Sequence, residues 1–282
     1  MTNHVIITES ASNIKAVARQ TLKGHWYTAI WIMLINIAIS MVPVVIIQEL
    51  IKNDNIIVLV QCYSYFVTGP LNLGLSIFFL KMFRGEKADH HDLLSGFNYF
   101  RNAFGLYISV IVREVLWTFL FVIPGIVAMF KYSMAFFVLA DHPDYTPSQC
   151  IAESCRLMDG NKDRLFRIIL SFAGWFILAS IPRCAVELYL GGLMTPGEEM
   201  FRAIVDTLAL GPAHWQGLAA GAALILVEIY LNVSECCFYD MLNENVVFKV
   251  YEQESKDSAQ EIQAQPEYEY IEMTEDKKDE ND

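Results

Sequence analysis

The sequence predicts an all-α, polytopic membrane protein with about six transmembrane helices, including a tight Pro-Gly hairpin, and a disordered acidic C-terminal tail. Its 282 residues are 54% hydrophobic and only 18% charged, whereas about 25% charged residues are typical of soluble domains. The apolar residues gather in blocks of the roughly 20 residues that cross the hydrocarbon core of a bilayer. We therefore predict three parts: an amphipathic cytoplasmic segment over residues 1–25, a helical transmembrane domain over 26–250, and the tail over 251–282.

The N-terminal segment has the pattern of a short amphipathic helix. Lys15, Arg19 and Lys23 follow one another at intervals of four residues, which places them on one face of a helix, away from apolar residues such as Val17. We expect this helix to lie at the membrane interface, where its cations meet anionic headgroups before the first span begins at Trp26.

Five apolar blocks can be distinguished along the chain, and the third is almost twice as long as one span. It covers 39 residues and contains Pro124 followed by Gly125, a pair that favours turns and breaks helices. This block is either one span with a buried extension or two short helices that fold back at that pair. The five blocks are Trp26–Gln48, Asn55–Leu80, Asn102–Ala140, Leu165–Pro182 and, roughly, Thr207–Ser234.

The distribution of Lys and Arg decides between the two arrangements, because cytoplasmic loops of membrane proteins carry an excess of these residues. With the third block folded into a hairpin, six spans leave 15 cations in the cytoplasmic segments and 3 in the external ones. With five spans the counts become 9 inside and 10 outside, and the asymmetry vanishes. The six-span topology is therefore favoured, with both termini in the cytoplasm, although each arm of the hairpin has only about 17 residues, the lower limit for a span.

The net charge of −12 comes mostly from the tail. Residues 251–282 hold 12 Asp and Glu against 3 Lys and are poor in aliphatic residues, a composition typical of disorder. The rest of the chain has no basic surplus, so nothing in its charge favours nucleic acid as a partner. With Tyr268 and Tyr270 among its acids, the tail is either a docking segment for a basic protein partner or a solvating extension.

The polar loop over Pro147–Asp163 is expected to form a short helix, capped by Thr146 or Ser148.

Four charged residues within the predicted spans are the candidate functional positions, because charges in a bilayer are costly. They are Arg113 and Glu114 in the third span, Lys131 in the fourth and Glu228 in the sixth. Glu114 is placed to pair with Lys131 across the hairpin, and Arg113 to pair with Glu228 near mid-membrane. Such pairs either fix the register of the helices, which we favour, or form a polar pathway for an ion, a proton or a lipid headgroup.

Signatures of other chemistry are weak. Asp89-His90-His91-Asp92 offers metal-ligand side chains, but neighbouring histidines are expected to point apart on a helix or strand, and a solvated loop is the favoured interpretation. The six cysteines form no CxxC pair. We find no phosphate-binding loop, nucleophile elbow or HExxH helix. We therefore expect no enzymatic activity, no cofactor and no metal.

A family resemblance covers about half of the chain. It begins with Gly69-Pro70-Leu71 and Gly74, includes Ile123-Pro124-Gly125-Ile126, and is most specific from Ser154 through Lys162 to Gly174-Trp175. In these residues the sequence resembles domain-of-unknown-function family nine-seven-five, and more loosely it is similar to membrane domains attached to some glycerophosphodiester phosphodiesterases. The resemblance implies a bacterial multi-pass protein of the cytoplasmic membrane with no established activity. The external segment from 183 to 215 is longer than is usual in the family, so its role is not implied by it.

Two functional hypotheses follow from the sequence. The leading one is a non-enzymatic membrane component, whose partners are the lipid bilayer and other proteins. The alternative is a small transporter or lipid-handling protein, in which the four charged residues within the spans form a polar pathway. The two hypotheses differ in whether water reaches those residues.

Overall fold

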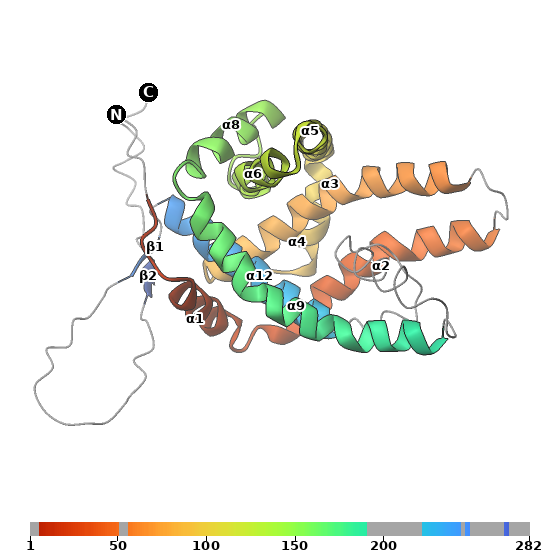
Figure 1. Cartoon of the computed structure of the whole chain (residues 1–282), viewed down its shortest axis with the longest axis horizontal. Coiled ribbons are helices and arrows are strands. Elements are labelled where there is room, and N and C mark those ends of the chain that lie inside the picture. Colours follow the sequence, from red (N-terminus) through yellow and green to blue (C-terminus); the bar gives the residue numbers. More distant parts are fainter. Residues whose placement is uncertain (1–5, 51–55, 191–221, 244–245, 249–267, 271–282) are drawn as a thin grey trace, which may run out of the picture.

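The computed structural model describes residues 6–50, 56–190, 222–243, 246–248 and 268–270, and within these ranges the chain is mostly helical (Figure 1). The external segment over 183–215 and most of the acidic tail therefore lie largely outside the described residues. The helices are α1 (Ala11–Leu22), α2 (Trp26–Leu50), α3 (Ile56–Phe83), α4 (His90–Ser95), the 3-10 helix η1 (Gly96–Tyr99), α5 (Phe100–Leu120), α6 (Val122–Tyr132), α7 (Ala135–Asp141), α8 (Pro147–Leu157), α9 (Lys162–Leu190) and α12 (Ala222–Leu242).

Five helical stretches within the described ranges are long and apolar enough to cross a membrane. They confirm the predicted membrane class and the division of the third apolar block into two. Of the sixth predicted span, over Thr207–Ser234, the described part lies in α12, which runs on to Leu242 and is not among the five. The five stretches are Trp26–Ile47, Val58–Phe83, His90–Leu120, Ile123–Asp141 and Lys162–Ile181.

The turn of the predicted hairpin lies earlier than the Pro-Gly pair. The helical path breaks at Phe121, whose extended backbone (φ −159°, ψ 144°) separates α5 from α6. Pro124 lies in the first turn of α6, where its missing N–H breaks no helical hydrogen bond. Gly125 serves the close packing of the two arms, because a Cβ at this position would collide with Thr118 of α5. The pair therefore starts the second arm rather than making the turn.

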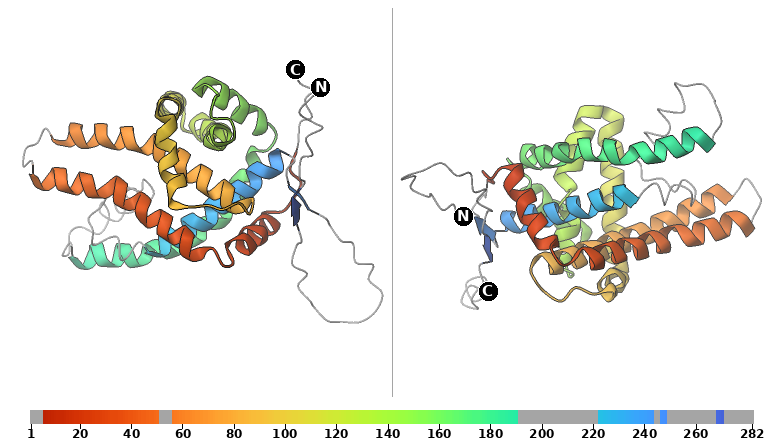
Figure 2. Two further views of the ribbon diagram at one scale, coloured as in Figure 1. Left: turned by 180° about the vertical axis from the view of Figure 1, so that it is seen from behind. Right: turned by 90° about the horizontal axis from the view of Figure 1, so that it is seen from below.

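The hairpin runs across the other long helices. Figure 1 shows α5 and α6 end-on, whereas α2, α3, α9 and α12 extend along the long axis of the molecule, and the right-hand view of Figure 2 shows the same crossing from below. Both arms pack on α8, and α5 also packs on α3. Helices that cross in this way cannot all be parallel to one membrane normal.

The N-terminal helix α1 packs its apolar face on protein. Its start is capped by the Ser10 hydroxyl, which accepts a hydrogen bond from the Asn13 backbone N–H. Ile14 and Leu22 are buried, and α1 contacts both α12 and α9. The Tyr230 hydroxyl of α12 donates to the Lys15 carbonyl at 2.7 Å. The expected amphipathic helix is present, but its apolar side is covered by protein instead of lying on lipid.

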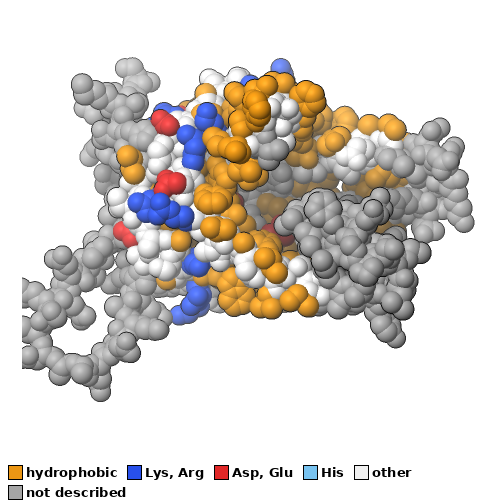
Figure 3. Space-filling model, viewed as in Figure 1, with side chains coloured by type: hydrophobic (Ala, Val, Ile, Leu, Met, Phe, Trp, Pro, Cys, Tyr) orange, Lys and Arg blue, Asp and Glu red, His pale blue; other side chains and the backbone are white. Residues whose placement is uncertain are grey.

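Two short strands lie at one end of the molecule, beside α1 (Figure 1). There β1 (Val246–Phe248) pairs antiparallel with β2 (Tyr268–Tyr270), with Val247 opposite Glu269. These three tail residues are thus in a strand, within a segment whose composition predicts disorder. On the face drawn in Figure 3, most charged side chains gather at this same end, beside α1 and α8, and apolar side chains cover most of the remaining described surface. We refer to this end as the polar end.

Candidate functional site

A buried ion cluster joins three helices at the polar end. Arg84, directly after α3, donates to both oxygens of Asp141 at 2.7 and 2.9 Å. The same guanidinium donates to both oxygens of Asp240 at 2.6 and 3.1 Å. The Tyr239 hydroxyl adds a hydrogen bond of 3.0 Å to Asp141. Asp141 ends α7 and Asp240 lies near the end of α12, so the cluster ties the ends of α3, α7 and α12 together.

The local structure explains how these side chains meet. Gly85 has a positive φ of 73° and ends α3 by turning the chain, a conformation that glycine adopts without strain. Arg84 therefore leaves the helix at its last turn and reaches toward α7 and α12. The side chain of Asp240 is fully buried, whereas those of Arg84 and Asp141 retain some contact with the surface.

In this cluster one cation, the Arg84 guanidinium, faces two carboxylates, and it remains protonated. Burial lowers the pKa of Arg84, but its hydrogen bonds to Asp141 and Asp240 more than offset this, so that the pKa is raised above its ordinary value. The five N–H groups of arginine suit such shared bidentate contacts, which a lysine could not reproduce. Removal of the guanidinium would leave two carboxylates facing each other in a buried site.

Replacing Tyr239 with phenylalanine tests the outer part of this cluster. Because Asp141 loses one hydrogen bond but keeps Arg84, we expect a loss of about 1–2 kcal/mol in the free energy of unfolding, seen as a fall of roughly 2–8 °C in the thermal midpoint in detergent. Tyr27→Phe is the matched control, because the Tyr27 side chain is exposed. An equal fall in both variants would contradict the assignment.

Arg113 and Glu114, the candidate charges of the hairpin's first arm, do not form the predicted pairs. The Arg113 guanidinium donates to the Ser109 carbonyl of its own helix at 3.0 Å. Among the residues that the structure describes, no ion pair joins Arg113 to Glu228 or Glu114 to Lys131. The prediction assumed arms that run parallel to the other spans, whereas α5 crosses them and passes beside α8.

Lys131, at the end of α6, lies near the polar loop helix α8. The Ser154 hydroxyl of α8 donates to the Lys131 carbonyl at 2.8 Å. Burial raises the pKa of the nearby Cys155 thiol, and the positive charges of Lys131, Lys162 and Arg113 reduce that rise. Both hairpin cations therefore lie close to one residue of α8.

Glu228 lies on α12, a helix in contact with α2, α3 and α9. Glu235 follows it by seven residues, on the same helical face, and is close enough to be influenced by its charge. Within the described part of the chain, neither carboxylate has a cation within ion-pair distance. The predicted partner Arg113 is thus not beside Glu228.

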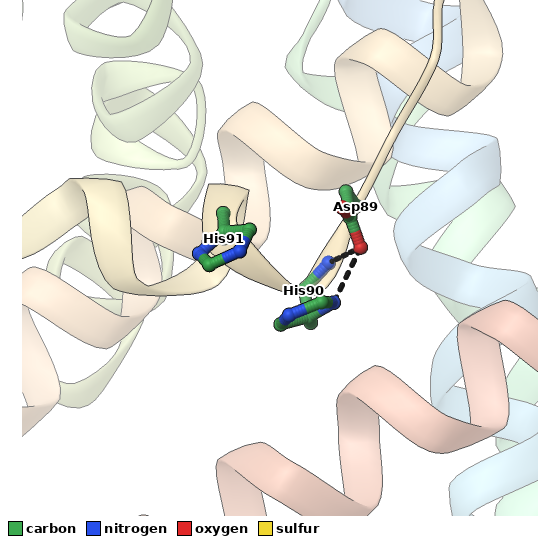
Figure 4. Close-up of side chains that lie close together, drawn as sticks. All are labelled: Asp89, His90 and His91. Carbon is green, nitrogen blue, oxygen red and sulfur yellow. Dashed lines mark hydrogen bonds and ion pairs between the residues drawn. The ribbon is translucent and has the colours of Figure 1, made fainter.

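The Asp89-His90-His91 group is the cap of a short helix (Figure 4). The Asp89 carboxylate accepts a hydrogen bond from the His90 backbone N–H at 2.7 Å and pairs with the His90 ring. The Asp92 carboxylate accepts one from the Asp89 backbone N–H at 2.8 Å. The two carboxylates therefore cap α4. Lys81 also binds Asp92, at 2.7 Å. The histidine rings do not point apart as expected: both are exposed, and their centroids are 4.2 Å apart. All three potential ligands are exposed, and their arrangement is explained by capping.

Comparisons with known proteins give one match. The model of a family described as "Protein of unknown function (DUF975)" matches residues 105–246. No curated protein and no solved structure matches the chain. The matched range runs from α5 to the start of β1 and includes Asp141, Tyr239 and Asp240, but not Arg84.

Sequence reasoning missed the ion cluster, although each member was visible. Arg84 counted as a cytoplasmic cation, and Asp240 lay beyond the predicted end of the sixth span at Ser234. The available signal was the apolar run Cys236-Cys237-Phe238 before Asp240, since a carboxylate that follows such a run needs a partner. Nothing local identifies Arg84 as that partner, because 156 residues separate the two.

Proposed function

The chain belongs to the DUF975 family, whose description assigns no function, and from this premise we propose that it is a non-enzymatic membrane component that acts through contacts with lipid. The observation that carries the proposal is the hairpin of α5 and α6, which runs across the other long helices and is apolar around its tip. The proposal has three parts: the hairpin lies within one leaflet, the polar end faces the cytoplasm, and the protein performs no reaction.

The hairpin tip has the surface of a segment immersed in hydrocarbon. Phe119 is 91% exposed and Ile123 75% exposed, and their neighbours are similarly open. Soluble proteins rarely expose contiguous apolar patches of this kind. The exposed apolar side chains of the tip are Val112, Val115, Leu116, Trp117, Phe119, Leu120, Phe121, Ile123, Ile126, Val127 and Met129.

The crossing direction supports a position in one leaflet. When α2, α3, α9 and α12 follow the membrane normal, α5 and α6 lie close to the membrane plane (Figure 2). Both arms contact α8, the helix of the polar loop, so the hairpin lies on the side of the polar end. A hairpin in this position displaces lipid over its whole length, on the half of the bilayer next to the charged surface.

This position also accounts for the charges of the hairpin. Arg113 and Lys131 are long side chains that can direct their cationic ends to the interface while their stems remain in apolar surroundings. Glu114 is similarly within reach of the interface when α5 lies in the plane. Charges at the edge of a leaflet cost far less than charges at the bilayer centre, so none of the three needs a partner across the membrane.

The excess of Lys and Arg at the polar end supports a cytoplasmic location for it. The start of α1, the end of α12 and the ion cluster of Arg84 all lie at this end. Together with the family resemblance, this supports a place in the bacterial cytoplasmic membrane. Any protein partner of the acidic tail would then meet it in the cytoplasm.

A cysteine-accessibility experiment tests the proposal in intact cells. Phe119→Cys and Asn53→Cys are made separately in a background without native cysteines and treated with a membrane-impermeant maleimide. Asn53, in the connection between α2 and α3, is expected to react from outside. Phe119 is expected to react neither in intact nor in opened cells, because lipid surrounds it. Labelling of Phe119→Cys from outside would show that the arms span the bilayer and would contradict the proposal.

The alternative, a polar pathway, is favoured by one observation, the two carboxylates Glu228 and Glu235 on one face of α12. The same experiment addresses it with Glu228→Cys. Silence at this position supports the lipid-contact proposal. Reaction with the polar reagent would show a water-filled path and would favour transport instead.

A further inference from the structure

We propose that the groove between α1 and α9 binds the phosphate headgroup of an anionic phospholipid. A cavity of about 170 Å³ lies between the start of α1 and the first turns of α9, and it is lined by Arg164, Arg167 and Ile168 on one side and by Glu9 and Ser10 on the other. The inference rests on the proposed function only in taking lipid as the ligand, and none of its residues belongs to the hairpin.

Two arginines provide the positive charge of this cavity. Arg164 has no ionic partner among the residues that the structure describes. Arg167 pairs with Asp163 at 2.8 Å, an exposed pair that contributes little and leaves donors available. The one acidic group of the lining, Glu9, accepts from the Asn13 amide at 2.9 Å. Arginine's planar fork of donors matches the oxygens of a phosphate.

A third cation and an apolar floor extend the site along the groove. Arg164, Ile168 and Phe172 follow at intervals of four residues, on one face of α9. From α1, the Lys15 ammonium lies over the Phe172 ring, 5.6 Å from its centroid. Lys15 is thus a third cation between α1 and α9, beyond the cavity lining and about two helical turns along α9 from Arg164.

The position of the groove favours a lipid over a free anion. Both arginines lie in the first turns of a candidate span, Lys162–Ile181. On the same helix, Leu170 is 56% exposed and follows Arg167 by three residues, so it offers apolar surface for acyl chains beside that arginine. The cavity has room for a phosphate group and the atoms next to it, but not for a whole lipid, so the chains would lie outside along α9. Cationic pockets between helices at this membrane depth typically bind lipid headgroups.

Lipid titration of the purified full-length protein, followed by native mass spectrometry, tests this site. The ligands are phosphatidylglycerol, which is anionic, and phosphatidylcholine, which is zwitterionic. The wild-type protein is expected to prefer phosphatidylglycerol by roughly tenfold or more. The double variant Arg164→Gln and Arg167→Gln is expected to lose that preference, and Arg164→Lys with Arg167→Lys to retain most of it.

Two further variants separate loss of the site from loss of the fold. Arg156→Gln removes an exposed cation of α8 at the same end of the molecule and is expected to bind as the wild type does. Ala11→Leu fills the cavity from α1 without a change of charge and is expected to weaken binding. The proposal is overturned if the wild type shows no preference, if both the glutamine double variant and Ala11→Leu keep it, or if inorganic phosphate displaces the lipid. Displacement by phosphate would identify a free-anion site.

The outcome is independent of the position of the hairpin. Loss of lipid preference in the arginine variants supports the groove whether Phe119 is shielded or labelled. Conversely, a shielded hairpin with no lipid preference in the wild type would leave the proposed function standing and remove the headgroup site.

Discussion

The variant Arg84→Gln is expected to lose about 3–5 kcal/mol of the free energy of unfolding. The reason is that Asp141 and Asp240 would remain buried without the guanidinium that both now accept from, at 2.6 to 3.1 Å. A glutamine amide can satisfy only part of these contacts and brings no positive charge. The measurement is the thermal midpoint of the purified protein in detergent, with its yield from membranes as a second readout.

Two variants serve as controls for Arg84→Gln. Asp240→Asn leaves Arg84 with Asp141, a matched pair of charges, so its loss of stability is expected to be clearly smaller than that of Arg84→Gln. Arg101→Gln removes an exposed cation nearby in the chain and is expected to be neutral. If Arg84→Gln is as stable as Arg101→Gln, the ion cluster does not hold the three helices together.

Gly74→Ala is expected to cost about 3 kcal/mol, a large effect for one methyl group. A Cβ at this position of α3 would collide with the backbone carbonyl of Leu93 in α4, and backbone atoms cannot rotate away as a side chain can. On the facing side, a Cβ at Gly96 would collide with the Pro70 carbonyl. The two elements would therefore have to move apart, and the buried packing of Leu93 would be lost.

Gly174→Ala is the matched control for this substitution. Gly174 also lies within a candidate span, but a Cβ there meets nothing within 4 Å. Because alanine is the better helix former, this variant is expected to be neutral or more stable by up to about 1 kcal/mol. The measurement is the thermal midpoint of Gly74→Ala and of Gly174→Ala, each compared with that of the wild type. A similar response of the two would mean that helix propensity, and not the contact of α3 with α4, controls the effect.

Much of the fold could be predicted from local patterns. The break in the third apolar block followed from its length, and the charge distribution required two arms rather than one. The loop helix α8 begins with the capping box of Thr146 and Gln149, so Thr146, one of the two predicted caps, is the one that forms. Such features depend on residues a few positions apart, where periodicity, capping and turn preferences act.

The arrangement of the arms could not be predicted in this way. Length and composition indicate that α5 and Ile123–Asp141 are apolar enough to cross a bilayer, but they say nothing about direction. Direction depends on packing between distant elements, such as the contacts of α5 with α3 and α8. The predicted pair of Arg113 with Glu228 assumed arms parallel to the other spans, and the crossing of α5 accounts for its absence. The direction of the hairpin does not explain why Glu114 and Lys131 form no ion pair in the described residues, because both lie on its arms.

The candidate site, too, could be predicted only in part from the sequence. Arg113, Glu114, Lys131 and Glu228 were identified because a charge inside an apolar block is visible in the sequence. The contact between Arg84 and Asp240 was not, because each lies at the edge of such a block and looks solvated there. Whether a side chain at the end of a helix is buried depends on which other helices pack there. Composition alone does not determine that packing.

The depth of the hairpin in a bilayer directly tests whether its arms lie within one leaflet. Spin labels are attached singly at Val112 and Phe119 of α5, and at Trp31 and Val42 of α2, all exposed positions, in a background without native cysteines. Depth is measured from the relative accessibility of each label to oxygen and to a water-soluble nickel complex. Along their helices the two pairs are separated by roughly 10 Å and roughly 16 Å, at 1.5 Å per residue.

If the hairpin lies within one leaflet, Val112 and Phe119 are expected at nearly the same depth, next to the polar end, while Trp31 and Val42 differ by most of their axial separation. The opposite result would be a depth difference between Val112 and Phe119 as large as their spacing along α5, with Phe119 approaching the far surface. That result would show that the arm spans the membrane and would contradict the central claim.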